Sequence, residues 1–160
     1  MSKDLEKTNV MRILDQKQIP YNEYTYDSTE ALSGIEVASF LKKDPDQVFK
    51  TLVTVGKSGE HYVFVIPVAQ ELDLKKAAKT VSEKNIEMVK SKELLPLTGY
   101  VHGGCSPIGM KKLFKTSIDE TAILFDTILF SAGKIGFQVE VPVDQLNKVI
   151  PYTLADLTVD

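Results

Sequence analysis

The sequence predicts an α/β (α+β) fold in a single domain, residues 1–160, built on a mixed, mostly antiparallel sheet with short flanking helices. Three observations support this prediction. The length of 160 residues fits one domain. Hydrophobic residues make up 43% of the chain, which is enough for a sizeable core. Segments with strand character come in hairpins with short helices between them, and this pattern favours an antiparallel or mixed sheet over a doubly wound parallel one.

Two helices and one strand are expected in the first 41 residues. Residues 3–18 have helical spacing, with apolar residues near one face at Leu5, Val10, Ile13 and Leu14. Residues 21–26 alternate aromatic with polar side chains and predict a strand, followed by a polar turn at 27–30. Ser33 and Glu36 form a capping box, so a helix is expected from there to about residue 41.

The clearest element is a β-hairpin formed by residues 48–55 and 61–68, with glycines 56 and 59 in the turn. Asp44 and Pro45 just before it indicate a single helical turn. Lys50 lies inside the first apolar strand, where burying an ammonium without a partner is costly. From the residues alone, Lys50 either points into a pocket or faces outward on a half-exposed strand, and the second interpretation is favoured.

The rest of the chain predicts further short elements. Helical segments are expected at 73–79, 91–95, 119–122 and 144–149, and strands at 86–89, 113–118, 128–131 and 136–141. Asp73 is the expected N-cap of the first of these helices. Pro96 and Gly99 are expected to end the second. The acidic C-terminal residues are expected to fray.

Composition excludes several classes of function. The net charge is −3 and Arg12 is the only arginine, which argues against strong non-specific binding of nucleic acid. No apolar run is long enough to cross a bilayer. The single cysteine agrees with a reducing compartment, so the expected location is the cytoplasm. The histidines, His61 and His102, have no metal-ligand spacing with Cys105, so neither a metal nor another cofactor is expected.

The most unusual stretch is Thr98–Lys112, which holds four of the nine glycines and the only cysteine. Glycines let a ligand approach the backbone closely, and Pro107 fixes the local backbone. Successive amides in such turns can bind an anion. The loop is therefore either a pocket wall of N–H donors or a tight turn whose glycines serve only its geometry, and spacing does not separate these interpretations.

Nucleophilic catalysis by the protein is disfavoured. Cys105 and His102 are three residues apart, but no third group orients the histidine. Cys105 is better interpreted as a small side chain packed beneath the loop, and Ser106 fails as a nucleophile for a similar reason. The residues by themselves thus lead to backbone amides and lysines that suit carbonyl or phosphate oxygens.

The sequence resembles the YbaK/EbsC family of aminoacyl-tRNA deacylases, whose bacterial members remove cysteine from mischarged tRNA for proline. Four stretches carry the resemblance, in the family's order: Pro45–Leu52, Pro67–Lys76, Thr98–Lys112 and Ser131–Gly136. The resemblance implies one α/β domain around a curved, mostly antiparallel sheet. The same fold forms the editing domain inserted in bacterial prolyl-tRNA synthetases.

The resemblance also implies a set of site residues. The catalytic candidates are Lys50, Gly103, Gly104 and Ser106, and the substrate-binding candidates are Tyr26, Thr51, Pro107, Ser131 and Gln138. For Lys50 it favours a pocket role over the outward orientation. Many relatives have an aspartate where this chain has Gln138. The implied mechanism uses the substrate's own cysteinyl thiol, with backbone amides stabilising the developing oxyanion.

The expected activity is trans-editing of Cys-tRNA(Pro), together with Cys-tRNA(Cys). The expected partners are the 3′ end of aminoacylated tRNA and prolyl-tRNA synthetase, which would hold the tRNA body for an acidic, arginine-poor enzyme. Two alternatives stay open. One is a deacylase of another misacylated tRNA, carrying alanine or serine, and the other is a non-catalytic nucleotide- or RNA-binding module, which the neutral Gln138 favours.

Overall fold

The computed structural model describes residues 7–27 and 32–160, and its strands form two sheets. A three-stranded sheet has the order β1 (Asn22–Thr25), β7 (Phe137–Pro142), β6 (Thr127–Ser131). A five-stranded sheet has the order β4 (Ile86–Met88), β2 (Phe49–Gly56), β3 (His61–Pro67), β5 (Lys115–Asp119), β8 (Thr153–Ala155). Only the β3–β5 and β5–β8 pairs are parallel. The predicted mixed, mostly antiparallel pairing is confirmed, but it is divided between two sheets.

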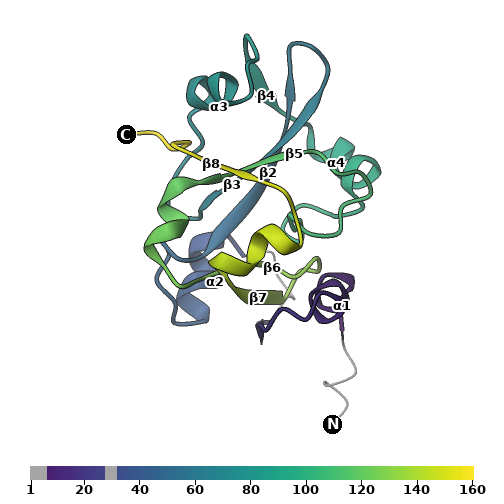
Figure 1. Ribbon diagram of the computed structural model, residues 1–160, viewed down its shortest axis with the longest axis vertical. Helices are drawn as coiled ribbons and strands as arrows, with labels where there is room; N and C mark the ends of the chain where they lie inside the picture. The colour runs from purple at the N-terminus through teal and green to yellow at the C-terminus, as the bar shows by residue number, and fades with distance from the viewer. Residues whose placement is uncertain (1–6, 28–31) are drawn as a thin grey trace.

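The two sheets meet where β2 begins. Val48 forms a parallel bridge with Leu129 on β6, and the Leu129 amide donates a 3.0 Å hydrogen bond to the Gln47 carbonyl. The Gln47 side chain also donates to the Thr127 carbonyl at 3.0 Å. The main hydrophobic cluster includes residues from both sheets, such as Phe49 and Val139. Figure 1 shows β6 and β7 beneath the long β2–β3 hairpin.

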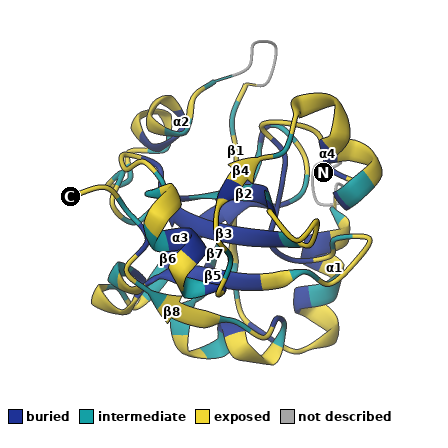
Figure 2. Ribbon diagram, turned by 90° about the horizontal axis from the view of Figure 1, so that it is seen from above, coloured by how far each residue is buried: buried dark blue, intermediate teal, exposed yellow. Residues whose placement is uncertain are grey.

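Short helices surround these sheets. The α-helices are α1 (Asn9–Gln16), α2 (Gly34–Phe40), α3 (Leu74–Thr80) and α4 (Ser91–Thr98), and the 3-10 helices are η2 (Glu120–Leu124) and η3 (Val143–Lys148). In Figure 2 the helices have exposed outer surfaces, whereas the central strands are buried. No helix in the described part of the chain is long and apolar enough to cross a membrane.

Sequence signals at the helix starts are confirmed. The capping box of Ser33 and Glu36 opens α2, and the Asp73 carboxylate accepts from the first amides of α3. The first predicted helix begins at Asn9, and residues 3–6 of its expected range, like residues 28–30 of the expected turn, lie outside the described residues. Between Asp44 and Gln47 the chain forms a hydrogen-bonded turn instead of a helical one.

Two expectations about the ends of elements are wrong. For α4 the expected end at Gly99 is confirmed, with a left-handed φ of 87°, but the expected end at Pro96 is wrong, because the helix runs through Pro96 to Thr98. This short helix tolerates the proline because the missing N–H removes one hydrogen bond, the one that would reach Lys92. The second wrong expectation concerns the C-terminus, which is firmly packed.

The C-terminal segment is held by β8 and by the residues that follow it. Leu157 is fully buried in the cluster around Phe64, and its amide donates a 2.9 Å hydrogen bond to the buried Asp119 carboxylate. Lys76 forms ion pairs with Asp156 at 3.0 Å and Asp160 at 2.8 Å. The acidic C-terminal segment does not fray, because Leu157 packs into the core and Lys76 forms ion pairs with the acidic residues.

Candidate functional site

A cavity of about 380 Å³ opens between the two sheets. Its walls come from β2, the start of α2, α4, the glycine-rich loop and the β6–β7 hairpin. Six of the residues singled out by sequence line it: Tyr26, Lys50, Thr51, Gly103, Ser131 and Gln138. They come from segments spread over more than a hundred residues, and the meeting of the two sheets brings them to one place.

Three of the nominated residues do not line this cavity. Gly104, Ser106 and Pro107 are buried inside the glycine-rich loop and are not among the residues that line the cavity. The Gly104 amide donates to the Val101 carbonyl at 3.0 Å, and the Ser106 hydroxyl accepts from the Ile108 amide at 3.3 Å. Pro107 lies instead at a second, smaller cavity. The Gly104 amide is thus already used inside the loop, so the expectation of a donor at that amide does not fit the geometry.

The loop has its shape because of its glycines and Tyr100. Gly103 has a φ of 89°, a conformation that side-chain-bearing residues rarely adopt. A Cβ on Gly104 would lie 3.1 Å from the Ile135 amide nitrogen, so any larger residue would be crowded against the turn after β6. The buried Tyr100 hydroxyl donates to the Ile108 carbonyl at 2.5 Å. These contacts hold the exposed Gly103 at the cavity wall.

The loop still offers amide donors. Among the described residues, the amides of Gly103 and Cys105 donate no hydrogen bond to the protein, and both residues line the cavity. A backbone N–H in this position can stabilise a carbonyl or phosphate oxygen without any rearrangement. The amides of Gly103 and Cys105 are therefore the candidate donors of this loop, and the wall of donors inferred from sequence stays a prediction.

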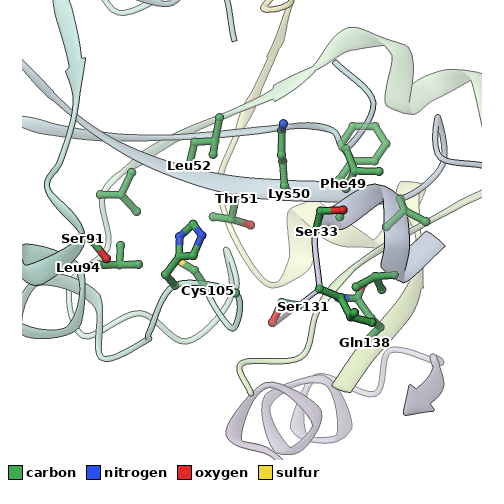
Figure 3. Close-up of a pocket in the computed structure, with 18 of the residues that line it drawn as sticks. Ser33, Phe49, Lys50, Thr51, Leu52, Ser91, Leu94, Cys105, Ser131 and Gln138 are labelled. Carbon is green, nitrogen blue, oxygen red and sulfur yellow. The ribbon is translucent and has the colours of Figure 1, made fainter. Parts of the chain in front are cut away.

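Lys50 is half-buried on β2 beside this cavity. Its side chain and that of Thr51 leave the strand in opposite directions, as Figure 3 shows and as strand geometry requires. Burial lowers the pKa of Lys50, and the charge of Glu71 partly offsets that effect. Lys50 forms no ion pair with any residue in the described ranges. Its ammonium is thus a partly desolvated charge available to a ligand.

The floor of the cavity is polar but uncharged. Ser131 and Gln138 are direct cross-strand partners on β6 and β7. The Ser131 hydroxyl accepts from the Gly133 amide at 3.1 Å. Gln138 is 7% exposed. Within the described ranges, neither its Oε1 nor the buried Oγ1 of Thr51 has a hydrogen-bond partner. Buried polar atoms without partners are uncommon, and at a cavity they indicate atoms that a ligand would satisfy.

Cys105 does not have the properties of a nucleophile. It lines the cavity but is largely buried, and burial raises the pKa of its thiol to about 12. At neutral pH the thiol is therefore protonated, whereas the thiolate is the reactive form. His102 also lines the cavity and is exposed. No group of three or more potential metal ligands occurs in the described part of the chain.

The structure adds residues that the sequence did not nominate. Ser33 and Val37 of α2 and Ser91 and Leu94 of α4 also line the cavity. Ser33 was visible in the sequence only as a helix cap. The side chains of α4 had no distinguishing signal, because their proximity to β2 follows from the packing of distant segments.

Comparison with known proteins identifies the family. Residues 29–149 match the model of the aminoacyl-tRNA editing domain. The chain is 45% identical over 157 residues to EbsC of Enterococcus faecalis, named as a candidate Cys-tRNA(Pro)/Cys-tRNA(Cys) deacylase, and the match covers 98% of this chain and 96% of EbsC. The chain belongs to the aminoacyl-tRNA editing domain family.

Two further similarities agree with this assignment. The chain is 30% identical over 136 residues to a proline–tRNA ligase of Kosmotoga olearia, covering 82% of this chain and 23% of the ligase. It also shares its fold with the crystal structure of a candidate trans-editing enzyme for prolyl-tRNA synthetase. That match has a TM-score of 0.82 and 22% identity, and it covers 97% of this chain and all of the other. The fold implied by the family resemblance is confirmed.

Proposed function

We propose that this protein deacylates mischarged tRNA in trans, with Cys-tRNA(Pro) as its main substrate and Cys-tRNA(Cys) as a second one. The observation that carries this proposal is the 45% identity to EbsC over nearly the full length of both chains. The cavity of about 380 Å³ supports it, because that volume is of the size that binds small ligands and would accommodate an aminoacyl group.

The proposed reaction uses the substrate as its own nucleophile. The cysteinyl sulfur attacks its ester carbonyl carbon, an S–C bond forms, and the C–O bond to the ribose breaks. The thiol proton ends on the ribose oxygen, and water then opens the cyclic thioester to free cysteine. The raised pKa of Cys105 supports this route, since the protein's own thiol is protonated at neutral pH.

In this proposal the protein positions the substrate and stabilises charge. The Gly103 and Cys105 amides serve the oxyanion, and a single donor of this kind is typically worth about 10²- to 10³-fold in rate. Gly104, Ser106 and Pro107 act indirectly by holding the loop. Tyr26, Ser131 and Gln138 contact the bound aminoacyl end. The Lys50 ammonium binds the ribose or phosphate of the terminal adenosine, because it leaves β2 on the side opposite Thr51.

The remaining parts of the proposal concern organisation and partners. Residues 1–160 act as one editing domain, supported by α1 in the main hydrophobic cluster and by the packed C-terminal segment. Prolyl-tRNA synthetase presents the tRNA, since the net charge of −3 gives the free protein little affinity for a polyanion. A substrate of this kind places the protein in the cytoplasm.

The deciding experiment is a deacylation assay on a panel of aminoacyl-tRNAs. Purified protein is incubated with Cys-tRNA(Pro), Cys-tRNA(Cys), Ala-tRNA(Pro), Ser-tRNA(Pro) and Pro-tRNA(Pro), and loss of the labelled amino acid is followed. The proposal requires fast release of cysteine from both tRNAs and no release of proline. Preferential release of alanine or serine would overturn the thiol-assisted route, because neither substrate has a thiol. Binding of these tRNAs without release of any amino acid would instead support the alternative of a non-catalytic RNA-binding module.

A further inference from the structure

One edge of β2 is open where it borders the cavity. In the β2–β3 ladder the hydrogen-bonded pairs include Gly56 with Glu60 and Val48 with Val68. Hydrogen-bonded pairs alternate along an antiparallel ladder, so the even-numbered residues of β2 direct their N–H and C=O groups toward β3. The odd-numbered residues direct theirs toward the opposite edge of β2.

Strand β4 covers only the far end of that opposite edge. The pairing ends with the Val89 amide, which donates to the Val53 carbonyl at 3.1 Å. At the other end, the bridge between Val48 and Leu129 holds the start of the strand. Between these points, the two main-chain groups of Thr51 have no partner among the described residues.

This open stretch of β2 borders the cavity. All six residues from 48 to 53 line it, and Phe49 and Val53 are each only 2% exposed. An unpaired strand edge pairs readily with another extended chain. Here the open edge is one residue long, Thr51, so it can pair with a single residue and not with a longer peptide strand. The unpartnered Thr51 Oγ1 in the same cavity is a second, independent sign of an absent ligand.

We propose that the Thr51 main chain binds the aminoacyl group of the substrate as if that group were one residue of an added antiparallel strand. The Thr51 N–H donates to the ester carbonyl oxygen, and the substrate's α-ammonium donates to the Thr51 carbonyl. One aminoacyl group has one donor and one acceptor in this spacing, which matches one hydrogen-bonded pair of an antiparallel ladder. This inference rests on the proposed function, since it takes an aminoacyl ester as the ligand.

The consequence is a division of labour within the site. The strand edge recognises the part that all α-aminoacyl esters share. The side chain of the amino acid is then left to the other walls, formed by α4, the glycine-rich loop and Gln138. Holding the ester carbonyl against a fixed N–H also restricts the acyl group to one orientation, which favours intramolecular attack by the thiol.

The test follows the backbone amides directly. The probe is 3′-deoxy-3′-(L-cysteinylamino)adenosine, a stable amide analogue of the aminoacyl end, added to ¹⁵N-labelled protein. We expect the amide of Thr51 to shift and its hydrogen exchange to slow. The neighbouring amides of Lys50 and Leu52 are paired with β3 and are matched internal controls. Equal changes at the Thr51, Lys50 and Leu52 amides, or no binding of the probe, would overturn the inference.

A pair of variants tests the same donor by activity. Thr51→Pro removes the N–H without breaking a β2–β3 hydrogen bond, and Thr51→Val keeps the N–H; both lack the hydroxyl. We expect Thr51→Pro to have a kcat/KM on Cys-tRNA(Pro) at least about tenfold below that of Thr51→Val. Equal values in two folded variants would count against the inference. If Thr51→Pro does not fold, the amide measurement decides.

The two proposals fail in distinguishable ways. If wild-type protein does not deacylate Cys-tRNA(Pro), the proposed function fails whatever the amides show. If wild type is active but the Thr51 amide does not change on addition of the probe, only the strand-edge inference fails. A third arm uses 3-mercaptopropionyl-tRNA, which keeps the thiol and ester but lacks the amine. We expect slower deacylation of this substrate, and a rate equal to that of Cys-tRNA(Pro) would argue against the bond to the Thr51 carbonyl.

Discussion

Ser131 on β6 lies directly across from Gln138 on β7, and this pair forms an uncharged floor for the cavity between the two sheets. The Ser131 hydroxyl accepts a hydrogen bond from the Gly133 amide, whereas the buried Gln138 Oε1 has no partner in the described part of the chain. An unsatisfied buried acceptor lowers stability, so its presence at a cavity indicates a role in binding.

Replacing Gln138 should therefore separate stability from activity. Gln138→Leu removes the unsatisfied acceptor and keeps similar volume, so we expect a gain of about 1 kcal/mol in unfolding free energy, or roughly 2–4 °C in Tm. The kcat/KM for Cys-tRNA(Pro) should fall about tenfold or more. The matched control is Gln47→Leu, which removes hydrogen bonds to Thr127. That variant should lose stability while the activity of its folded fraction changes little, and a Gln138→Leu protein with the same pattern would refute the binding role.

Cys105→Ala should retain most of the activity. With a pKa of about 12, roughly one Cys105 thiol in ten thousand is ionised at pH 8. Deacylation is expected to stay within about tenfold of wild type, since losing a true nucleophile typically costs far more. Iodoacetamide should also label the wild-type thiol much more slowly than free cysteine at that pH. Abolished deacylation together with rapid labelling would point to a protein nucleophile after all.

Lys50 should contribute charge to binding at the expense of stability. Burial lowers the pKa of Lys50, so the folded state disfavours its charged form. That cost is present below the ordinary lysine pKa and disappears at high pH, where the side chain is neutral in both states. Lys50→Met should consequently be more stable than wild type at pH 7, with the difference shrinking as pH rises.

The activity of Lys50→Met should fall, although its stability at pH 7 should rise. We expect Lys50→Met to lose at least about tenfold in kcat/KM, because a charge-assisted contact to the nucleotide is removed. Wild-type activity should decline as pH rises through the lowered pKa of Lys50, after the uncatalysed hydrolysis of the ester is subtracted. A Lys50→Met enzyme with wild-type kcat/KM would mean that Lys50 only lines the cavity.

Addition of prolyl-tRNA synthetase should accelerate deacylation of Cys-tRNA(Pro). The protein has a net charge of −3 and a single arginine, so its own affinity for tRNA should be weak and should fall as salt rises. A ternary complex would raise the effective concentration of substrate at the site. The measurement is the initial rate with increasing synthetase, with a non-cognate synthetase as control. A rate independent of prolyl-tRNA synthetase would exclude this partnership.

The C-terminal segment should be important for folding. Leu157→Ala removes a fully buried side chain from the cluster around Phe64, and we expect a loss of about 2–5 kcal/mol in unfolding free energy. Val159→Ala is the control, since Val159 is 46% exposed and the hydrogen bond of its amide to Glu71 remains. Urea unfolding of both variants distinguishes a packed tail from a loose one, because equal midpoints would indicate that the tail adds nothing to stability.

Local signals explain why much of the fold could be read from the sequence. The Ser33–Glu36 capping box, the Asp73 cap and the β2–β3 hairpin each depend on residues close together in the chain. Such local signals carry no information about which distant strands pair with one another. The parallel β5–β8 pair and the burial of Leu157 depend on contacts between segments tens of residues apart.

The same distinction applies to the candidate site. The family resemblance nominated nine residues. No local sequence signal distinguished those that line the cavity from those that are buried inside the glycine-rich loop. Gly103 lies at the wall while Gly104, Ser106 and Pro107 are buried, because the Gly104 amide folds back onto Val101.

The sequence by itself determined the mixed, mostly antiparallel sheet, the helix starts, the glycine-rich loop and the resemblance to the editing family. Only the tertiary structure decided which groups share the cavity: the direction of Lys50 relative to Thr51, the unpartnered oxygen of Gln138, and the open edge of β2. The physical reason is that backbone propensity and capping act over a few residues, whereas an open strand edge exists only once every other strand has found its partner.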